Sequence, residues 1–270
     1  MDTTVINKNT TTMKTISLKS WLTDIIVMAK RELLKVKHSQ EKLFDVTVMP
    51  IIMVIVFSQL FGGAIMGNVK AYLPLVVPGI LIQTLVMASG AAGTQLREDL
   101  DKGATDRFNS LPISRIAPLA GTLISDIIRY IIAAVFALGT GAALGWRASA
   151  GFGWLLVAIG RLAIVTTWAL SWLFALVGVL AKGAATVTTI SSFLTMFLAF
   201  LSNAYIPVTS LPKWLKVIAE NNPVSHLITA FKEVAYNGNF GHEAWLVLLI
   251  SLLIVLILAP VTVLTYSKKN

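Results

Sequence analysis

Residues 245–266 read WLVLLISLLIVLILAPVTVLTY and contain no charged side chain. A helix needs about 20 mostly apolar residues to cross the hydrocarbon of a bilayer, whereas a membrane strand needs about 10. A helix also satisfies its backbone hydrogen bonds within one segment, as lipid requires. This stretch therefore predicts a transmembrane helix, and it decides the fold class because similar runs recur along the chain.

Five further apolar runs precede it. They cover about residues 44–61, 73–94, 119–144, 152–180 and 186–205. The chain is 56% hydrophobic and 13% charged, whereas a soluble domain is about 25% charged. We therefore predict an all-α integral membrane protein, with residues 1–270 as one transmembrane domain and a six-helix bundle over residues 44–266.

The segment before the first run divides in two. Residues 1–17 are polar, lack the apolar core of a signal peptide and are expected to form a flexible cytoplasmic tail. Residues 18–40 place apolar side chains at helical spacing and basic side chains toward the C-terminal half. This pattern predicts an interfacial helix lying in the membrane plane. A soluble helical linker is the alternative.

Basic residues indicate the orientation. Of the 22 lysines and arginines, 15 fall on the side that holds both termini and 5 on the other. Because Lys and Arg concentrate in cytoplasmic loops, both termini are expected in the cytoplasm, with the chain in the plasma membrane. The net charge of +9 then reflects topology. No nucleic-acid partner is expected, since no basic patch is interleaved with stacking aromatics.

A charged segment follows the second run. Charges of both signs flank apolar residues over positions 97–108, as in a short amphipathic helix that docks in a groove of a cytosolic partner. An ordinary solvated loop fits the same pattern. The candidate partner-coupling residues are Arg97, Glu98, Asp99, Asp101, Gly103, Ala104, Thr105, Arg107 and Phe108.

Asp126, Arg129 and Arg161 are the candidate polar residues inside predicted spans. Asp126 and Arg129 lie three residues apart, on one face of the third helix. Charges in hydrocarbon are costly and usually have partners, so the two either pair structurally or face a hydrophilic pathway. Arg161 lies about ten residues into the fourth run. It either faces a cavity or marks a later start of that helix.

The longest outer segment separates the fifth and sixth runs. Residues 213–218 and 224–236 each suit a short helix, and together they suit a re-entrant hairpin in the outer leaflet. A fully exposed loop is the alternative. The candidate residues here are Pro207, Pro212, Trp214, Asn222, Pro223 and Lys232.

Catalytic signatures are absent from the sequence. It has no GxxxxGK[ST] phosphate loop, no GxSxG elbow and no cysteine. Its three histidines, at positions 38, 226 and 242, are too scattered for a metal site. We therefore expect neither an enzyme nor a bound metal or cofactor.

Two segments resemble a known family. The first is Asp101-Lys102-Gly103-Ala104-Thr105-Asp106-Arg107 followed by Leu111-Pro112-Ile113-Ser114-Arg115. The second is Tyr205-Ile206-Pro207, Leu211-Pro212-Lys213-Trp214-Leu215, Asn222-Pro223 and then Lys232 and Gly238. Together with the layout, they resemble the permease subunit of type-2 ABC exporters, in particular the daunorubicin-resistance-like permeases. Two departures are Ala104, where the family usually has Thr, and Lys232, which replaces an Arg and its bidentate contacts.

The resemblance implies function and partners. It implies an ATP-driven exporter of an amphipathic small molecule, drug, lipid or peptide, working by alternating access. The partners would be two cytosolic ABC ATPase subunits, which bind ATP and magnesium, and a second permease copy in a homodimer or heterodimer. Residues 97–108 would form the coupling helix. The alternatives are a permease for lipid-linked polysaccharide or teichoic acid, and a non-transporting membrane assembly protein.

Overall fold

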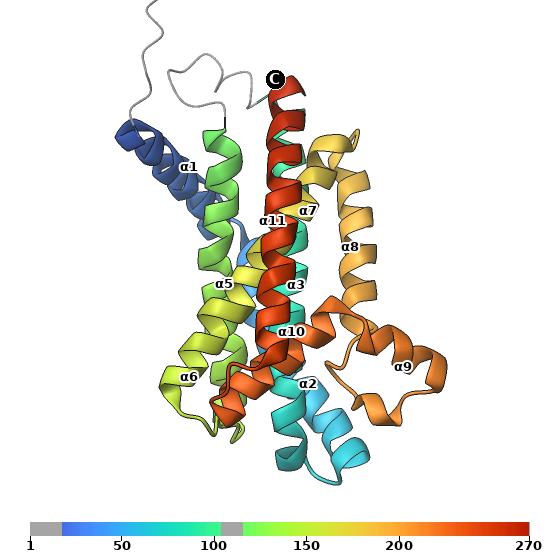
Figure 1. Cartoon of the computed structure of the whole chain (residues 1–270). Coiled ribbons are helices and arrows are strands. Elements are labelled where there is room, and N and C mark those ends of the chain that lie inside the picture. Colours follow the sequence, from blue (N-terminus) through green and yellow to red (C-terminus); the bar gives the residue numbers. More distant parts are fainter. Residues whose placement is uncertain (1–17, 104–115, 270) are drawn as a thin grey trace, which may run out of the picture.

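The computed structural model describes residues 18–103 and 116–269, which fold as helices joined by short connections (Figure 1). The predicted tail at residues 1–17 lies outside the described residues. The helices are α1 (Leu18–His38), α2 (Gln40–Met66), α3 (Val69–Asp101), α5 (Ala117–Ala143), α6 (Phe152–Val157), α7 (Val165–Leu180), α8 (Ala184–Phe200), α9 (Lys213–Glu220), α10 (Pro223–Lys232) and α11 (His242–Lys269).

Five helical segments are long and apolar enough to cross a membrane: Leu43–Met66, Val69–Asp101, Ala117–Ala143, Phe152–Leu180 and His242–Lys268. They confirm five of the predicted spanning runs as helices. The remaining run, residues 186–205, forms α8, an apolar helix of 17 residues. At about 1.5 Å per residue, it is a few ångströms shorter than a hydrocarbon core of about 30 Å.

The fourth span is one continuous helix. Between α6 and α7 the backbone widens to a π-helix, η1 (Ala158–Ile164), without a break. The later start that Arg161 suggested is therefore wrong, because the helix begins at Phe152. A π-turn accommodates an extra residue within a continuing helix.

Several predicted helix ends were wrong. α2 continues through Gly62-Gly63 to Met66, and the turn follows at Gly67 with φ +77°. α3 extends past Thr94 to Asp101, so residues 97–101 end this helix rather than begin a separate one. Gly103, with φ +63°, follows its end. Conversely, α8 ends at Phe200, not near Tyr205. The predicted ends at 62 and 94 followed loss of hydrophobicity, which does not itself stop a helix.

α3 is the centre of the bundle and packs against α2, α5, α7 and α8. Its contact with α7 is made backbone to backbone. A Cβ on Gly93 would overlap the carbonyl oxygen of Phe174, and a Cβ on Gly178 would overlap that of Gly93. Small residues allow membrane helices this close approach, where packing rather than the hydrophobic effect holds helices together.

The predicted N-terminal helix is confirmed as α1, and its inner face contacts protein. Ile25, Met28 and Ala29 are buried, and α1 packs chiefly on α5. A Cβ on Gly121 of α5 would come within 2.5 Å of Met28 Cβ. α1 is therefore docked to the bundle by both packing and, at its C-terminal half, the ion pairs described below.

Candidate functional site

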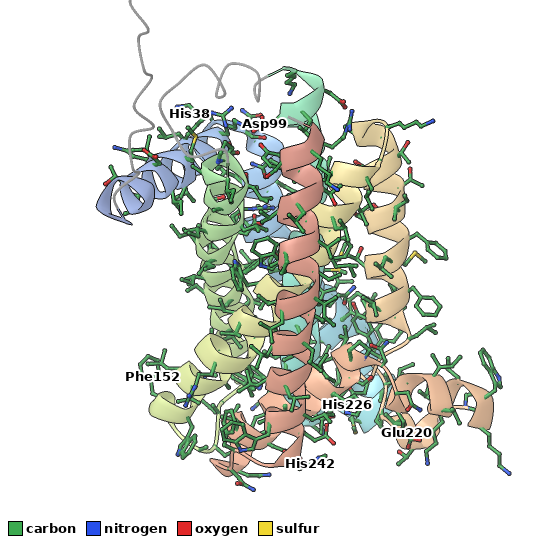
Figure 2. The ribbon with its side chains drawn as sticks, turned by 45° about the horizontal axis from the view of Figure 1, so that its top comes forward. His38, Asp99, Phe152, Glu220, His226 and His242 are labelled. Atoms are coloured by element: carbon green, nitrogen blue, oxygen red, sulfur yellow. The ribbon has the colours of Figure 1, made fainter. Side chains whose placement is uncertain are left out.

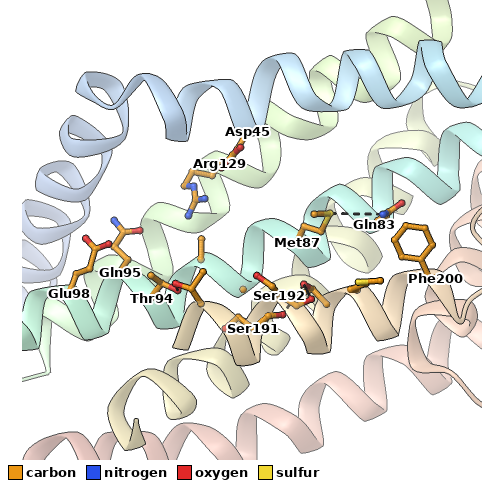
Figure 3. A pocket seen from close by; sticks show the side chains of 15 residues that line it. Asp45, Gln83, Met87, Thr94, Gln95, Glu98, Arg129, Ser191, Ser192 and Phe200 are labelled. Carbon is orange, nitrogen blue, oxygen red and sulfur yellow. Dashed lines mark hydrogen bonds between the residues drawn. The ribbon is translucent and has the colours of Figure 1, made fainter. Parts of the chain in front are cut away.

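A groove of about 590 Å³ lies among α2, α3, α5 and α8 (Figure 3). Its volume falls in the range of small-molecule sites, about 300–1,000 Å³. The lining residues are Asp45, Gln83, Met87, Gly90, Ala91, Thr94, Gln95, Glu98, Arg129, Thr188, Ser191, Ser192, Thr195, Met196 and Phe200. A smaller hollow of about 170 Å³ shares Asp45, Gln83, Met87 and Arg129 with it. Residues far apart in the chain thus build one site.

α8 gives the groove its hydroxyl groups. Thr188, Ser191, Ser192 and Thr195 recur at helical spacing and line the groove. The other side of α8 is apolar and exposed, with Phe193 at 71% and Phe197 at 47% of their accessible surface. Sequence reasoning missed this hydroxyl stripe. The signal was present as Ser and Thr spaced three and four apart in an otherwise apolar run.

Asp126 and Arg129 pair with each other. Arg129 Nη1 donates to Asp126 Oδ1 over 2.7 Å, and both side chains are almost fully buried. Arg129 also lines the groove, whereas Asp126 is not among the lining residues. The predicted pair is therefore present, and its arginine also lines the hollow; a role of this hollow in transport stays a prediction.

Several predicted partner-coupling residues lie at the C-terminal end of α3 and contact neighbouring parts of the chain. Asp99 accepts hydrogen bonds from Lys35 Nζ at 2.9 Å and from Arg31 Nη1 at 3.2 Å, both on α1. The adjacent Gln95 donates to the buried Glu32 of α1 at 2.7 Å. The end of α3 is thus tied to α1 by an ion-pair network (Figure 2 labels Asp99 and His38 at this end).

Arg97 ties the same end of α3 to the turn between α7 and α8. It donates to the carbonyl oxygen of Ala181 at 2.8 Å and also pairs with Asp101. Glu98 lines the groove and pairs with Lys102 at 3.4 Å. The remaining candidates, Ala104, Thr105, Arg107 and Phe108, lie outside the described residues, so a separate coupling helix stays a prediction.

Arg161 lies in η1 of the fourth span and is exposed. Its guanidinium carbon sits 5.9 Å from the centre of the Phe240 ring, within cation–π range. Arg161 is not among the residues that line the groove. The cavity that the sequence suggested for it is therefore not the groove described here.

The outer segment forms the two short helices predicted for it, α9 and α10, with the latter continuing into the π-turn η3 (Glu233–Asn237). Pro212 directly precedes α9 and Pro223 begins α10, positions where a proline's missing N–H costs nothing. Pro207 directly precedes a short 3₁₀ turn, Val208–Ser210. Trp214 on α9 is 68% exposed. α10 packs on α3, α11 and η1, so the segment is anchored through α10 (Figure 1).

Asn222 explains why α8 stops. Its Nδ2 donates to the carbonyl oxygens of Leu198 and Leu201 at 2.9 and 2.8 Å, and its Oδ1 accepts from Val224 N at 2.8 Å. One buried amide thus caps the C-terminus of α8 and the N-terminus of α10. We expect Asn222→Ala to lower the free energy of unfolding by about 2–3 kcal/mol, because buried backbone groups lose their partners.

Thermal unfolding of the purified variant in detergent tests this expectation. Asn221→Ala is the control, because exposed Asn221 bonds only to Val217 O within its own helix. Equal melting temperatures for the two variants would contradict the capping role.

Lys232 ends α10 and is partly buried. Burial disfavours the ammonium form and lowers the pKa of Lys232 to about 8. Within the described part of the chain, no carboxylate pairs with it. His226 of the same helix pairs with Glu243 of α11 at 2.7 Å (Figure 2). These contacts are structural links at the outer end of the bundle.

A separate cavity of about 240 Å³ adjoins the groove at Phe200. It is lined mostly by apolar and aromatic residues of α2, α3, α8, α9 and the segment after α8, including Phe57, Tyr72, Tyr205 and Leu215. Phe200 lines both the groove and this cavity. The polar hollow and the apolar one are therefore adjacent. Among the described residues, no group of three His, Cys, Asp or Glu side chains is arranged to hold a metal ion.

The sequence was compared with known families and proteins. Residues 23–236 match the family model described as ABC-2 type transporter. Over 242 residues the chain is 36% identical to the daunorubicin resistance ABC transporter permease protein DrrB1 of Streptomyces coeruleorubidus, covering 89% of this chain and 84% of that one. It is 26% identical over 200 residues to the probable doxorubicin resistance ABC transporter permease protein DrrC of Mycobacterium tuberculosis, covering 71% and 69%.

The helical bundle, the absence of a phosphate loop in the sequence and these matches all point to the same family. The family match and the 36%-identical relative each cover most of the chain, and both describe a membrane component of an ABC transporter. The chain therefore belongs to the ABC-2 type transporter family, among its membrane-spanning permease subunits.

Proposed function

We propose that this chain is the permease of a drug exporter, in which the groove among α2, α3, α5 and α8 forms part of the substrate path. The observation that carries this proposal is a polar groove of drug-sized volume inside a bundle of apolar helices. Relatives named for daunorubicin and doxorubicin resistance support the substrate class. The compound would leave past Phe200 through the apolar outer cavity.

In this proposal α8 is a sixth span of the plasma membrane. Both termini lie in the cytoplasm, and α9 and α10 dip into the outer leaflet. Two observations support it. α8 packs against α3, and α1, the end of α3 and the C-terminus lie at the same end of the bundle (Figure 1). The basic residues concentrate at that end.

A second permease copy would cover the groove. The groove is lined in part by α2 and α8, whose other faces are apolar: Ile52, Leu60, Phe193 and Phe197 are all exposed. Hydroxyl and charged side chains facing hydrocarbon are costly, so a second copy of this chain, or a similar subunit, would shield them. The complete transporter would contain two ATPase subunits, which hold ATP and magnesium.

Co-purification tests the proposed function. The tagged chain, solubilised in mild detergent, should retain a protein with a phosphate-binding loop, and inside-out vesicles containing both should accumulate doxorubicin on addition of ATP. Retention of an ATPase with accumulation of a lipid-linked sugar instead would favour the polysaccharide alternative. Reproducible absence of any ATPase, with the chain intact, would favour a non-transporting assembly protein.

Coupling to the ATPase is tested at Gly103. Its φ of +63° is inaccessible to proline, whose ring fixes φ near −65°. Gly103→Pro is therefore expected to redirect the chain between α3 and α5 and to lower permease-stimulated ATPase activity at least about tenfold, without reducing the amount of protein in the membrane. Gly145→Pro, at φ +107° on the outer side, is the control. Unchanged stimulation in Gly103→Pro would exclude this segment as the coupling element.

A further inference from the structure

Three side chains that line the groove have buried polar atoms without a hydrogen-bond partner in the described chain: Gln83 Oε1, Arg129 Nε and Ser191 Oγ. The residues are 3%, 2% and 5% exposed, respectively. Buried polar groups are nearly always hydrogen-bonded, so each exception needs an explanation. Three exceptions around one hollow point to a ligand with matching polar groups.

Ser191 differs from its neighbours on α8. The hydroxyls of Thr188, Thr189 and Thr195 each donate to the carbonyl oxygen four residues earlier, at 2.8–3.1 Å. Back-bonding of this kind is the usual way for a Ser or Thr in a membrane helix to satisfy its hydroxyl. The Ser191 hydroxyl makes no such bond. It is available both as a donor and as an acceptor.

The side-chain amide of Gln83 makes only one weak hydrogen bond in the described chain. Its Nε2 donates to the sulfur of Met87 at 3.9 Å, and a thioether is a poor acceptor. Figure 3 shows Gln83 and Met87 together on α3, near Phe200, with Ser191 on α8 and Arg129 on α5 at other sides of the same hollow. Side chains that carry an unpartnered amide oxygen, guanidinium N–H and hydroxyl therefore line this one hollow.

Charge is largely neutralised within the chain. Arg129 is paired with Asp126, and Glu98 is paired with Lys102. Asp45 is exposed at the groove and already interacts with another group of the chain. We therefore expect the three unpartnered atoms to discriminate among ligands. Met87, Met196 and Phe200 provide apolar surface for the rings of a ligand. Methionines adapt readily to rings of different shape.

We propose that Gln83, Ser191 and Arg129 determine substrate specificity by hydrogen-bonding to hydroxyl and carbonyl groups on the apolar ring system of the transported compound. Gln83 Oε1 accepts from a hydroxyl, the Nε–H of Arg129 donates to a carbonyl or hydroxyl oxygen, and Ser191 serves either. This inference rests on the proposed function. It narrows the substrate class to amphiphiles whose rings carry oxygen groups.

The test measures the binding of two probes to the purified full-length chain in nanodiscs without ATP. Doxorubicin has fused rings with hydroxyl and carbonyl groups, whereas tetraphenylphosphonium is a cation of apolar rings without any hydrogen-bonding group. Gln83→Met and Ser191→Ala are each expected to weaken doxorubicin binding about fivefold and to leave tetraphenylphosphonium binding unchanged. Thr189→Val is the control, since Thr189 is on α8 but does not line the groove.

The variants also have a folding readout. Ser191 Oγ and Gln83 Oε1 have no hydrogen-bond partner in the described chain, and Gln83 Nε2 has only its long contact with the sulfur of Met87. Neither variant should therefore lower the melting temperature of the ligand-free protein. Equal weakening of both probes would show a change of packing and overturn the inference. Unchanged doxorubicin binding in both variants would also overturn it. If the wild-type chain neither binds nor exports doxorubicin, the proposed function itself fails. That outcome differs from the two results above, in which the wild type binds doxorubicin and only the variants contradict the inference.

Discussion

Replacing Gly93 with alanine is expected to prevent formation of the native bundle. The added methyl would overlap the carbonyl oxygen of Phe174, and at the same crossing Gly178 meets the backbone of Gly93. Backbone atoms cannot rotate away as a side chain can, so α3 and α7 would have to separate. We expect a loss of more than about 3 kcal/mol in the free energy of unfolding, since overpacking of flexible side chains alone costs about 1–3 kcal/mol.

Gly139→Ala is the matched control. Gly139 is also a helix-interior glycine, in α5, and a Cβ there would meet nothing within 4 Å. This variant should gain about 0.5–1 kcal/mol, because alanine loses less conformational freedom on folding. Size-exclusion profiles and melting curves of the detergent-solubilised variants give the comparison. A folded Gly93→Ala protein with a wild-type melting temperature would disprove the close α3–α7 contact.

Replacing Arg129 alone with methionine is expected to lower the free energy of unfolding by about 3–5 kcal/mol. The reason is the position of Asp126, whose side chain is completely buried beside it. Removing the guanidinium leaves a buried carboxylate without its cation. The double variant Asp126→Leu with Arg129→Met should recover most of the loss, because an apolar pair of similar volume needs no charge compensation.

The double variant also separates stability from recognition. If Arg129 contacts the transported compound, the restored protein should fold but still bind doxorubicin more weakly than the wild type. Lys102→Met is the control, because the exposed pair of Lys102 with Glu98 should contribute less than about 1 kcal/mol. An Arg129→Met single variant as stable as this control would show that the Asp126–Arg129 pair does not stabilise the bundle.

Several features of the outer and cytoplasmic ends were predictable only in part. The pattern of residues 213–218 and 224–236 correctly predicted two short helices. Pro212, Asn222 and Pro223 lie at their starts, where proline and asparagine are favoured. The same residues gave no sign that Asn222 would also cap α8, because its partners Leu198 and Leu201 lie more than 20 positions away. Likewise, the charges of Arg97 and Asp99 suggested a partner surface, but both side chains contact other parts of this chain.

The sequence alone determined that this chain is a membrane protein built of helices. Segments such as residues 245–266 are decided locally, because their length and apolar character match the bilayer and their backbone must bond within the segment. The groove was decided only by the tertiary structure. Gln83, Arg129 and Ser191 lie on three helices and become one site when α5 and α8 pack against α3, at separations that glycines permit and that no local pattern encodes.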